Sequence, residues 1–311
     1  MKTVYLLHDT WTHYSKADWI AAHFPIDSFV IIKNTRPWFG KYLFLRARRL
    51  GLLKVFDDVL FRAYWLSCRG LSDYLLTKRM MRKLQCDLPP DYIRPPCYHI
   101  RDINSADAQT LLKRLAPDVC LLTIHPILEA KIFSIPKFGM LVFHPGITPE
   151  YRGPHSAFWA TLNHEFWGIG WSLLKVEKGI DTGAVLGQGS AQNIDPLRQS
   201  HICLQHQSHI EGLPHVVDIL RRLSLGEQPR VSVHGRTSTN HTHPGITDYI
   251  RLRRVLKRLR TDHCARQAFN SYPGHIEGFE QLLEGPCDHR ECPNCNADHR
   301  TNKGEPNQEL F

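Results

Sequence analysis

The sequence has no run of apolar residues that approaches the ~18 consecutive positions needed to span a bilayer as a helix. Its opening segment, MKTVYLLHDT, has a run of only four apolar residues before the first His-Asp pair, too few for the hydrophobic part of a secretory signal. The nine cysteines are an odd number and are scattered along the chain, a usage that does not suit a disulfide framework. We therefore expect a cytoplasmic protein in a reducing compartment.

Two common glycine-rich phosphate loops are also missing. Neither G-x-G-x-x-G nor G-x-x-x-x-G-K followed by Ser or Thr occurs, which argues against nicotinamide and nucleoside triphosphate cofactors. What the chain does have is a globular composition, with 42% hydrophobic and 22% charged residues over 311 positions. This composition excludes a disordered chain and a collagen-like repeat, and it provides enough apolar material for a sizeable core.

Acidic residues are fewer than basic ones, and the imbalance is local. The chain has 39 Lys and Arg residues against 30 Asp and Glu, a formal net charge of +9. The stretch from Lys33 to Leu84 holds 13 basic and three acidic residues, and positions 251–260 hold six basic residues and no acid. A local excess of one charge requires a local explanation, such as a surface that faces an anionic partner.

Short apolar runs alternate with helical patterns along the first two thirds of the chain. Buried strands are expected at 3–8, 27–32, 119–124 and 140–144, with helices between them. Such alternation predicts the α/β class, with a Rossmann-like, mostly parallel sheet and helices on both faces. In such sheets ligands bind beyond the carboxyl ends of the strands, where His125 and His144 fall. We expect this α/β domain to span residues 1–226.

Two other segments depart from this rhythm. A basic helical insertion is expected at about residues 36–85, in which Leu52, Phe56 and Leu66 share one helical face. The pattern favours a helix packed on the sheet, and the alternative is that the 41–66 segment lies on an anionic membrane surface or an acidic partner. Residues 227–311 are expected to form a small, polar, helical C-terminal extension, with a basic helix at 248–260 and a Cys/His-rich tail.

Two groups of His and Cys residues can be compared with metal sites. In the tail, short Cys and His spacing suits a tetrahedral zinc site formed by Cys287, His289, Cys292 and Cys295. The second, distant Cys pair of common zinc motifs is missing, and the alternative is a disordered tail with free thiols. The other group lies on one helix without suitable acidic partners, so we expect a solvated helix face for His201, His206 and His209.

The residues that suggest a catalytic function lie in two segments, FHPGITPEYRGPHSAFWATLN at 143–163 and KVEKGIDTGAVLGQ at 175–188. The first indicates a strand that ends in His144, a proline-stiffened loop and then a helix. The second indicates a hairpin whose Gly-Ile-Asp-Thr-Gly tip could direct Asp181 toward that imidazole. A His at a strand end that faces an Asp on a neighbouring loop is a suitable pair for proton transfer.

Together these segments resemble the folate-dependent formyltransferase family, which includes the glycinamide ribonucleotide, methionyl-tRNA and amino-sugar N-formyltransferases. In that family a strand ends Asn-x-His-Pro, a loop continues Leu-Pro-x-Tyr-Arg-Gly, and a Gly-Ile-Asp-Thr-Gly loop follows. The resemblance extends from about residue 100 to 190. The matching positions are His144-Pro145, Pro149, Tyr151-Arg152-Gly153, Trp159-Ala160, Asn163 and Gly179-Ile180-Asp181-Thr182-Gly183.

The resemblance implies a Rossmann-like domain that transfers a formyl group from 10-formyltetrahydrofolate to a primary amine. In the family a protonated His and an Asn amide donate hydrogen bonds to the formyl oxygen, while an Asp holds the His and helps to relay the proton. By position, His144 and Asp181 take the catalytic roles. The resemblance also implies folate contacts from Ile127, Leu128, Gly179, Ile180, Asp181 and Gly183.

One position departs from the family pattern. The family Asn falls at Val142, and a valine side chain cannot donate a hydrogen bond. Candidates for a replacement donor are Thr123, His125 and His155. The retained His, Asp and loop favour an active formyltransferase. The alternatives are a formyltetrahydrofolate hydrolase, with water in place of the amine, and a catalytically impaired protein that binds folate or another partner.

The sequence specifies neither the amine acceptor nor the oligomeric state. The basic segments suit a small phosphorylated or nucleotide-linked acceptor, because phosphates pair with Lys and Arg. A nucleic-acid acceptor is disfavoured. A tRNA-acting member of the family is expected to carry a folded, β-rich C-terminal domain, whereas the extension here is short, helical and polar.

Overall fold

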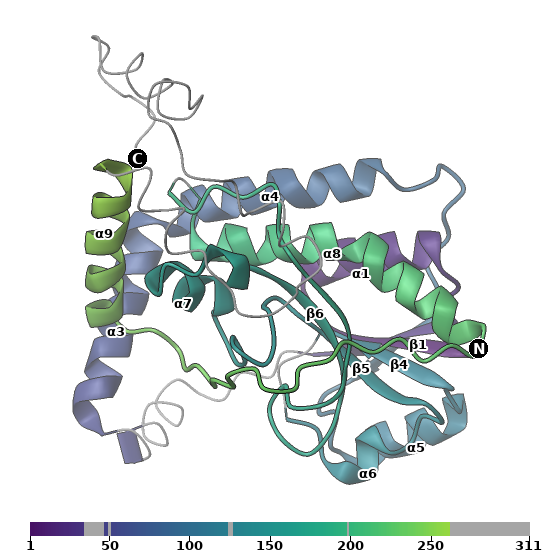
Figure 1. Ribbon diagram of the computed structural model, residues 1–311. Coiled ribbons are helices and arrows are strands. Elements are labelled where there is room, and N and C mark those ends of the chain that lie inside the picture. The colour runs from purple at the N-terminus through teal and green to yellow at the C-terminus, as the bar shows by residue number, and fades with distance from the viewer. Residues whose placement is uncertain (34–46, 49–50, 124–126, 198, 262–311) are drawn as a thin grey trace.

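A computed structural model describes residues 1–33, 47–48, 51–123, 127–197 and 199–261. Its centre is a seven-stranded sheet in the spatial order β3-β2-β1-β4-β5-β6-β7 (Figure 1). Strands β1 to β5 are parallel to one another, whereas β6 is antiparallel to both β5 and β7. The α/β class and the mostly parallel sheet are thereby confirmed. The strands are Thr3–His8 (β1), Ser28–Ile32 (β2), Cys97–Ile100 (β3), Val119–Leu122 (β4), Gly139–His144 (β5), Gly170–Lys175 (β6) and Val185–Ser190 (β7).

Helices cover both faces of this sheet, as expected. One face packs against α1 (Trp11–His23), α4 (Gly70–Cys86) and α8 (His201–Ser224). The other face packs against α5 (Ala106–Leu115) and α6 (Ala130–Phe133). Alternate residues of each strand enter opposite clusters, because successive side chains of a strand point to opposite faces. In β5, Leu141 and Phe143 join the apolar cluster on the side of α1, α4 and α8, the first core cluster. Met140 and Val142 join the apolar cluster on the side of α5 and α6, the second core cluster.

The helix expected within the basic insertion forms, but it does not pack on the sheet. This helix, α3 (Leu52–Cys68), lies beside α9 (Ile246–Thr261) at one edge of the molecule (Figure 1). Phe61, Tyr64 and Trp65 pack around Tyr249 of α9, and the two tyrosine hydroxyl oxygens are 3.1 Å apart. These aromatic rings provide the apolar side that α3 buries, so the Leu52 side of the helix is left facing solvent.

The chain beyond α8 returns to the main unit before it forms α9, which contains the basic helix expected at 248–260. Arg236 pairs with the buried Glu150 carboxylate, with Nη2 and Oε2 2.7 Å apart. The Trp159 indole, in α7 (Ser156–Leu162), donates to the carbonyl of Thr242 at 2.9 Å. A short 3-10 turn at Phe166–Gly168 follows α7 and leads into β6. The domain boundary near residue 226 remains a prediction.

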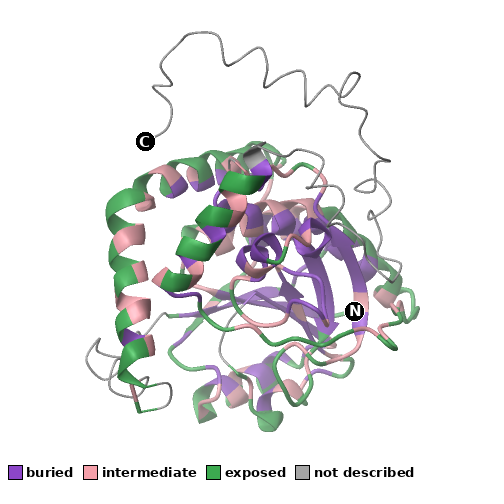
Figure 2. Ribbon diagram, turned by 60° about the vertical axis from the view of Figure 1, so that its left-hand side comes forward, coloured by how far each residue is buried: buried purple, intermediate pink, exposed green. Residues whose placement is uncertain are grey.

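Buried residues concentrate in the sheet and in the inner sides of α1 and α8, whereas the outer helices are largely exposed (Figure 2). Across the described ranges, no helix has the length and apolar character needed to cross a membrane.

Candidate active site

β5 ends at His144, and the loop that follows folds back onto its imidazole. The residue is 6% exposed, and its Nε2 lies 2.8 Å from the backbone oxygen of Tyr151. A carbonyl oxygen can only accept, so Nε2 carries a proton. Ser172 of β6 secures the same loop, because its hydroxyl donates to the Gly146 oxygen at 2.7 Å and accepts the Thr148 N–H at 3.1 Å. The ring is thereby held in one orientation at the carboxyl end of the strand.

Asp181 reaches this imidazole from the loop between β6 and β7. Its Oδ2 lies 3.6 Å from Nδ1 of His144 and accepts the N–H of Gly153 at 3.1 Å. Arg152 donates to the carbonyl of Ile180 at 3.1 Å, so the two loops are joined at two further points. The separation of 3.6 Å is within ion-pair range but longer than a hydrogen bond. The structure therefore brings together the two side chains that the sequence assigns to proton transfer.

Two glycines allow the loop between β6 and β7 to bring Asp181 close to His144. Gly179 has a φ of +134°, a conformation that side chains with a Cβ rarely adopt. At Gly183, a Cβ would collide with the carbonyl oxygen of Lys175, which closes the base of the loop. Asp181 itself has a φ of +50°, in the left-handed region where Asp and Asn are enriched among non-glycine residues. The Gly-Ile-Asp-Thr-Gly pattern is thus explained by the loop geometry.

The predicted folate contacts fall on two separate segments. Ile127 follows β4 and is 68% exposed, and its carbonyl accepts from the Asn104 amide at 2.9 Å. Leu128 packs against the same apolar cluster as Val142. Ile180 is 41% exposed in the Asp181 loop, between Gly179 and Gly183. Ile127 and Ile180 therefore leave apolar side chains in solvent, while Leu128 contributes to the core below.

The described candidates for a replacement hydrogen-bond donor both point away from Val142. Thr123 continues β4 on the opposite face from Val142, beside Tyr5 of the first core cluster, and neither hydroxyl has a hydrogen-bond partner of ordinary geometry. His155 is held by His243, with Nε2 and Nδ1 3.0 Å apart, and packs edge-on against His201. The third candidate, His125, lies outside the described residues.

A buried lysine is linked through His209 to the strand that carries His144, and the sequence did not indicate it. Lys16 of α1 is enclosed, and its Nζ lies 3.0 Å from Nδ1 of His209. The Nε2 atom of His209 lies 3.2 Å from the carbonyl oxygen of Phe143, so that nitrogen is the protonated one and Nδ1 accepts from Lys16. Burial lowers the pKa of Lys16 to about 7 and the pKa of His209 well below its ordinary value.

The solvated helix face expected for the three histidines of α8 is wrong. His201 and His209 are buried. Burial, and to a smaller extent the positive charge of Lys16, lowers the pKa of His206 to about 3. A signal was present, because His209 lies four and seven residues before the buried Leu213 and Val216, on the apolar side of the helix. The wrong expectation came from treating His as a polar surface residue.

These neutral, buried histidines predict a loss of stability in acid. The unfolded chain takes up protons on His201, His206 and His209 near pH 6.5, whereas burial holds their pKa values far lower in the folded state. The free energy of unfolding should fall between pH 7 and 5, by up to roughly 2 kcal/mol for each fully shifted histidine. Urea unfolding at several pH values measures this slope. His209→Gln should reduce it, whereas His99→Gln, on the exposed edge strand β3, should not. Identical slopes in all three proteins would contradict the assignment.

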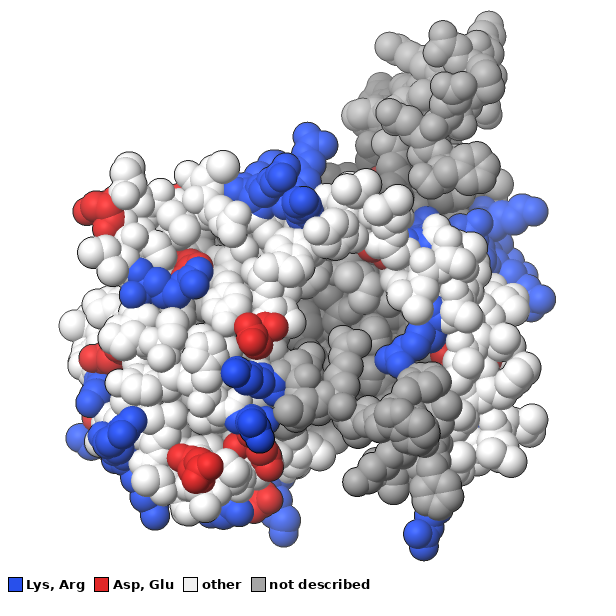
Figure 3. Space-filling view, turned by 180° about the vertical axis from the view of Figure 1, so that it is seen from behind, with Lys and Arg blue, Asp and Glu red and all other residues white. Residues whose placement is uncertain are grey.

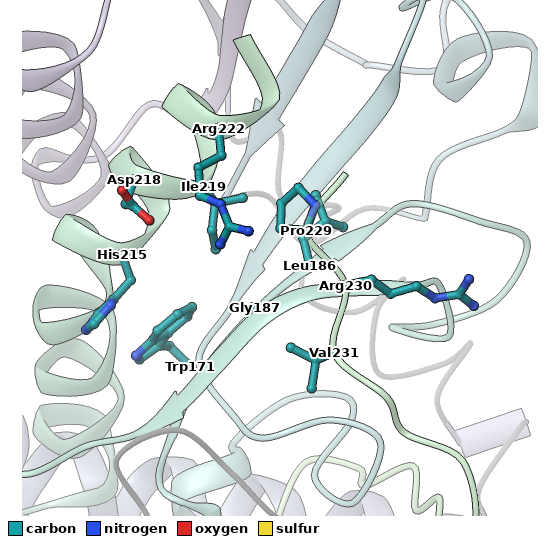
Figure 4. A pocket seen from close by; sticks show the side chains of 10 residues that line it. All are labelled: Trp171, Leu186, Gly187, His215, Asp218, Ile219, Arg222, Pro229, Arg230 and Val231. Carbon is teal, nitrogen blue, oxygen red and sulfur yellow. The ribbon is translucent and has the colours of Figure 1, made fainter. Parts of the chain in front are cut away.

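A pocket of about 200 Å³ lies elsewhere, between α8 and β7 (Figure 4). Its volume is below the ~300–1,000 Å³ of ordinary small-molecule sites, and it contains no residue of the predicted site. We therefore do not assign it to the folate. Its lining consists of Trp171, Leu186, Gly187, His215, Asp218, Ile219, Arg222, Pro229, Arg230 and Val231.

Metal ligands were expected only in the tail. Within the described part of the chain, no group of three or more His, Cys, Asp or Glu side chains is placed to bind a metal ion. The predicted zinc ligands lie outside the described residues, so zinc binding there stays a prediction for Cys287, His289, Cys292 and Cys295.

Comparison with known proteins gives a family match over the middle of the chain. Residues 77–212 match the family model described as Formyl transferase. The methionyl-tRNA formyltransferase of Dehalococcoides mccartyi is 30% identical over 142 residues, which cover 45% of this chain and 45% of that protein. The one from Pelotomaculum thermopropionicum is 29% identical over 182 residues, or 58% of this chain and 54% of that protein. The chain thus spans about half the length of these curated relatives.

A solved sugar N-formyltransferase from a Shewanella species is similar in fold, with a TM-score of 0.47 and 13% identity. The likeness covers 82% of this chain and 88% of that chain. The range matched by the family model includes His144, Asp181 and both loops that hold them. The resemblance of this chain to the formyltransferase family is confirmed by the match over residues 77–212.

Proposed function

We propose that this chain is a cytoplasmic enzyme that moves a formyl group from 10-formyltetrahydrofolate to the primary amine of a small, phosphorylated or nucleotide-linked acceptor. The approach of the Asp181 carboxylate to the His144 imidazole, at 3.6 Å within the Formyl transferase range, carries this proposal. The pair lies at the carboxyl end of β5, the edge of the sheet at which ligands of open α/β sheets bind.

Formyl transfer requires a proton carrier and a donor near the formyl oxygen. 10-Formyltetrahydrofolate supplies the formyl carbon. When the amine attacks, negative charge develops on the formyl oxygen and the nitrogen must lose a proton. In His144, Nε2 is occupied by the Tyr151 carbonyl, so Nδ1 is the atom that can exchange a proton. Asp181 stabilises the protonated ring. As the bond between the formyl carbon and N10 of the folate breaks, the proton passes to N10, directly or through water, and tetrahydrofolate leaves.

The residues around the pair fit a flat, partly apolar ligand. Exposed Ile127 and Ile180 offer apolar side chains that take no part in the core, and the loop that carries Asp181 presents backbone groups beside Ile180. A pterin ring combines an apolar face with a polar edge, so these groups suit it. We assign the folate contacts to Ile127, Leu128, Gly179, Ile180, Asp181 and Gly183.

The surface charge favours an anionic acceptor. One group of Lys and Arg side chains lies at the upper part of the edge that carries α3 and α9, and others are spread over the rest of this face (Figure 3). In α9, Arg251, Arg253 and Arg254 are exposed while Leu252 and Leu259 are buried. The relatives named as methionyl-tRNA formyltransferases are matched over only about half their length, so a small phosphorylated acceptor remains the proposal.

One observation favours a second function, the binding of folate or another partner without turnover. Val142 supplies no amide, and both described candidates for a replacement donor point elsewhere. The acyl-transfer site then lacks one of its usual donors.

A screen with 10-formyltetrahydrofolate labelled with carbon-13 in the formyl group separates these functions. Mass spectrometry should detect the label on an amine from a panel of amino sugars, sugar nucleotides, phosphorylated amines and aminoacyl-tRNA. Label released as formate would instead support a hydrolase, and calorimetric binding without any product would support the binding protein. His144→Ala serves as the inactive control.

A further inference from the structure

The exposed surface of α3 and α4 is unusually apolar for helices at the edge of a protein. In α3, Leu52, Phe56 and Leu60 follow one another at four-residue spacing and face solvent, with Phe56 63% exposed. The opposite side of α3 is already buried against α9 through its aromatic residues. The helix therefore has two apolar sides, and the described residues cover only one of them. The large exposed apolar side chains of the two helices are Leu52, Leu53, Phe56, Leu60, Leu66, Leu71, Tyr74, Leu75 and Leu76.

The charge that remains on this surface is positive. The acidic residues of the two helices are turned inward, because Asp57 and Asp58 pair with Lys54 at 3.1 and 3.4 Å, and Asp73 is buried. On α4, the exposed Leu71 and Leu75 are followed on the same side of the helix by two basic residues. These are Arg79 and Arg82, which are exposed and form no ion pair with an acidic side chain of the described residues.

We propose that the exposed surface of α3 and α4 binds the face of a lipid bilayer that contains anionic lipids. Leucine and phenylalanine side chains gain free energy at the boundary of the acyl chains, and arginines next to them pair with lipid phosphates. Because the described helices are unsuited to crossing a membrane, this contact lies in the interface. The proposal does not depend on the proposed enzymatic activity.

Other occupants fit this surface less well. A second copy of the chain would bring two sets of arginines together without acids between them, which costs Coulomb energy. Nucleic acid would pair with the arginines but would leave Leu52, Leu53 and Phe56 in water. A bilayer offers both a phosphate layer and an apolar layer to one face.

Sedimentation with vesicles tests this proposal on the full chain. The protein should sediment with phosphatidylcholine vesicles that contain phosphatidylglycerol, and much less with phosphatidylcholine alone. The double variant Arg79→Glu and Arg82→Glu should weaken binding by at least about tenfold, since each basic residue near an anionic surface contributes ~1 kcal/mol. The double variant Leu53→Ser and Phe56→Ser should also weaken binding, because it removes two exposed apolar side chains.

Matched controls lie on other parts of the surface. Lys113→Glu, at an exposed position of α5, and Ile93→Ser, at an 87% exposed loop position, should leave vesicle binding unchanged. All variants should keep the circular dichroism and melting temperature of the parent, because the altered side chains are exposed. Absence of vesicle binding, or equal binding by the surface variants and controls, would overturn the proposal. The proposal would also be overturned if the double variant Leu53→Ser and Phe56→Ser dissociated a dimer in sedimentation velocity runs and left vesicle binding unchanged.

Discussion

Replacing His144 or Asp181 should reduce formyl transfer by about 10²–10⁴-fold, the usual contribution of a general acid–base group. The imidazole is buried at the end of β5 and faces a single carboxylate, so no neighbour on the described loops duplicates either side chain. His144→Ala removes the proton carrier. Asp181→Asn is the sharper variant, because its amide oxygen can still accept the Gly153 N–H while the charge that faces the imidazole is lost. Steady-state rates with the amine found by the screen measure the effect.

The loss should appear in kcat more than in KM, because these groups act on the reacting atoms and not on the folate as a whole. The double variant should be little slower than either single variant, because the loss of either group already abolishes the proton relay. Thr182→Ala is a control from the same loop, with an exposed side chain that does not reach His144. Folded His144 and Asp181 variants with unchanged turnover would exclude the proton-relay mechanism.

Much of the α/β framework could be predicted because its strands are apolar runs that need both faces covered. The strand expected at 3–8 has the same bounds in the structure, and that expected at 140–144 differs by one residue. The edge strand β3 was missed because it has four residues and is largely exposed, so it carries no apolar signal. The break at Arg69 between α3 and α4 was also missed, because the helical pattern continues through it.

The positions of individual side chains could be predicted where the sequence spacing fixes the direction in which a side chain points. His144 and Asp181 lie within ion-pair range, as expected, because a strand end and a tight loop admit few alternatives, and their catalytic roles stay a prediction. Thr123 was proposed as a donor although it is two residues after Leu121 and so shares the opposite face from Val142. The packing of α3 could not be predicted, since its partner α9 lies nearly two hundred residues away in the sequence. The helical pattern of α3 does not specify which side of the helix another element covers.

Val142→Asn should raise formyl transfer, by up to about 10²–10³-fold, if the natural protein lacks the donor that its relatives supply. In the structure Val142 pairs with Leu122 and Leu174 and is only half-buried, next to Leu128. Thr123 points to the other face of the sheet, so the new amide does not duplicate its hydroxyl. Rates for the wild type and the variant, measured with the same labelled formyl donor, test the prediction.

Val142→Leu is the matched control because it has nearly the shape of Asn and no hydrogen-bond donor. Faster transfer in the Asn variant alone would assign the gain to the amide, whereas faster transfer in both would assign it to packing. The melting temperature must be followed in parallel, since an amide without a partner among Leu128 and its apolar neighbours costs ~1–3 kcal/mol of stability. A stable Asn variant that binds folate and still formylates no amine would show that the missing donor is not what limits this chain. Such a result would favour a binding protein over an impaired enzyme, because the one group absent from the family constellation would then have been restored without effect.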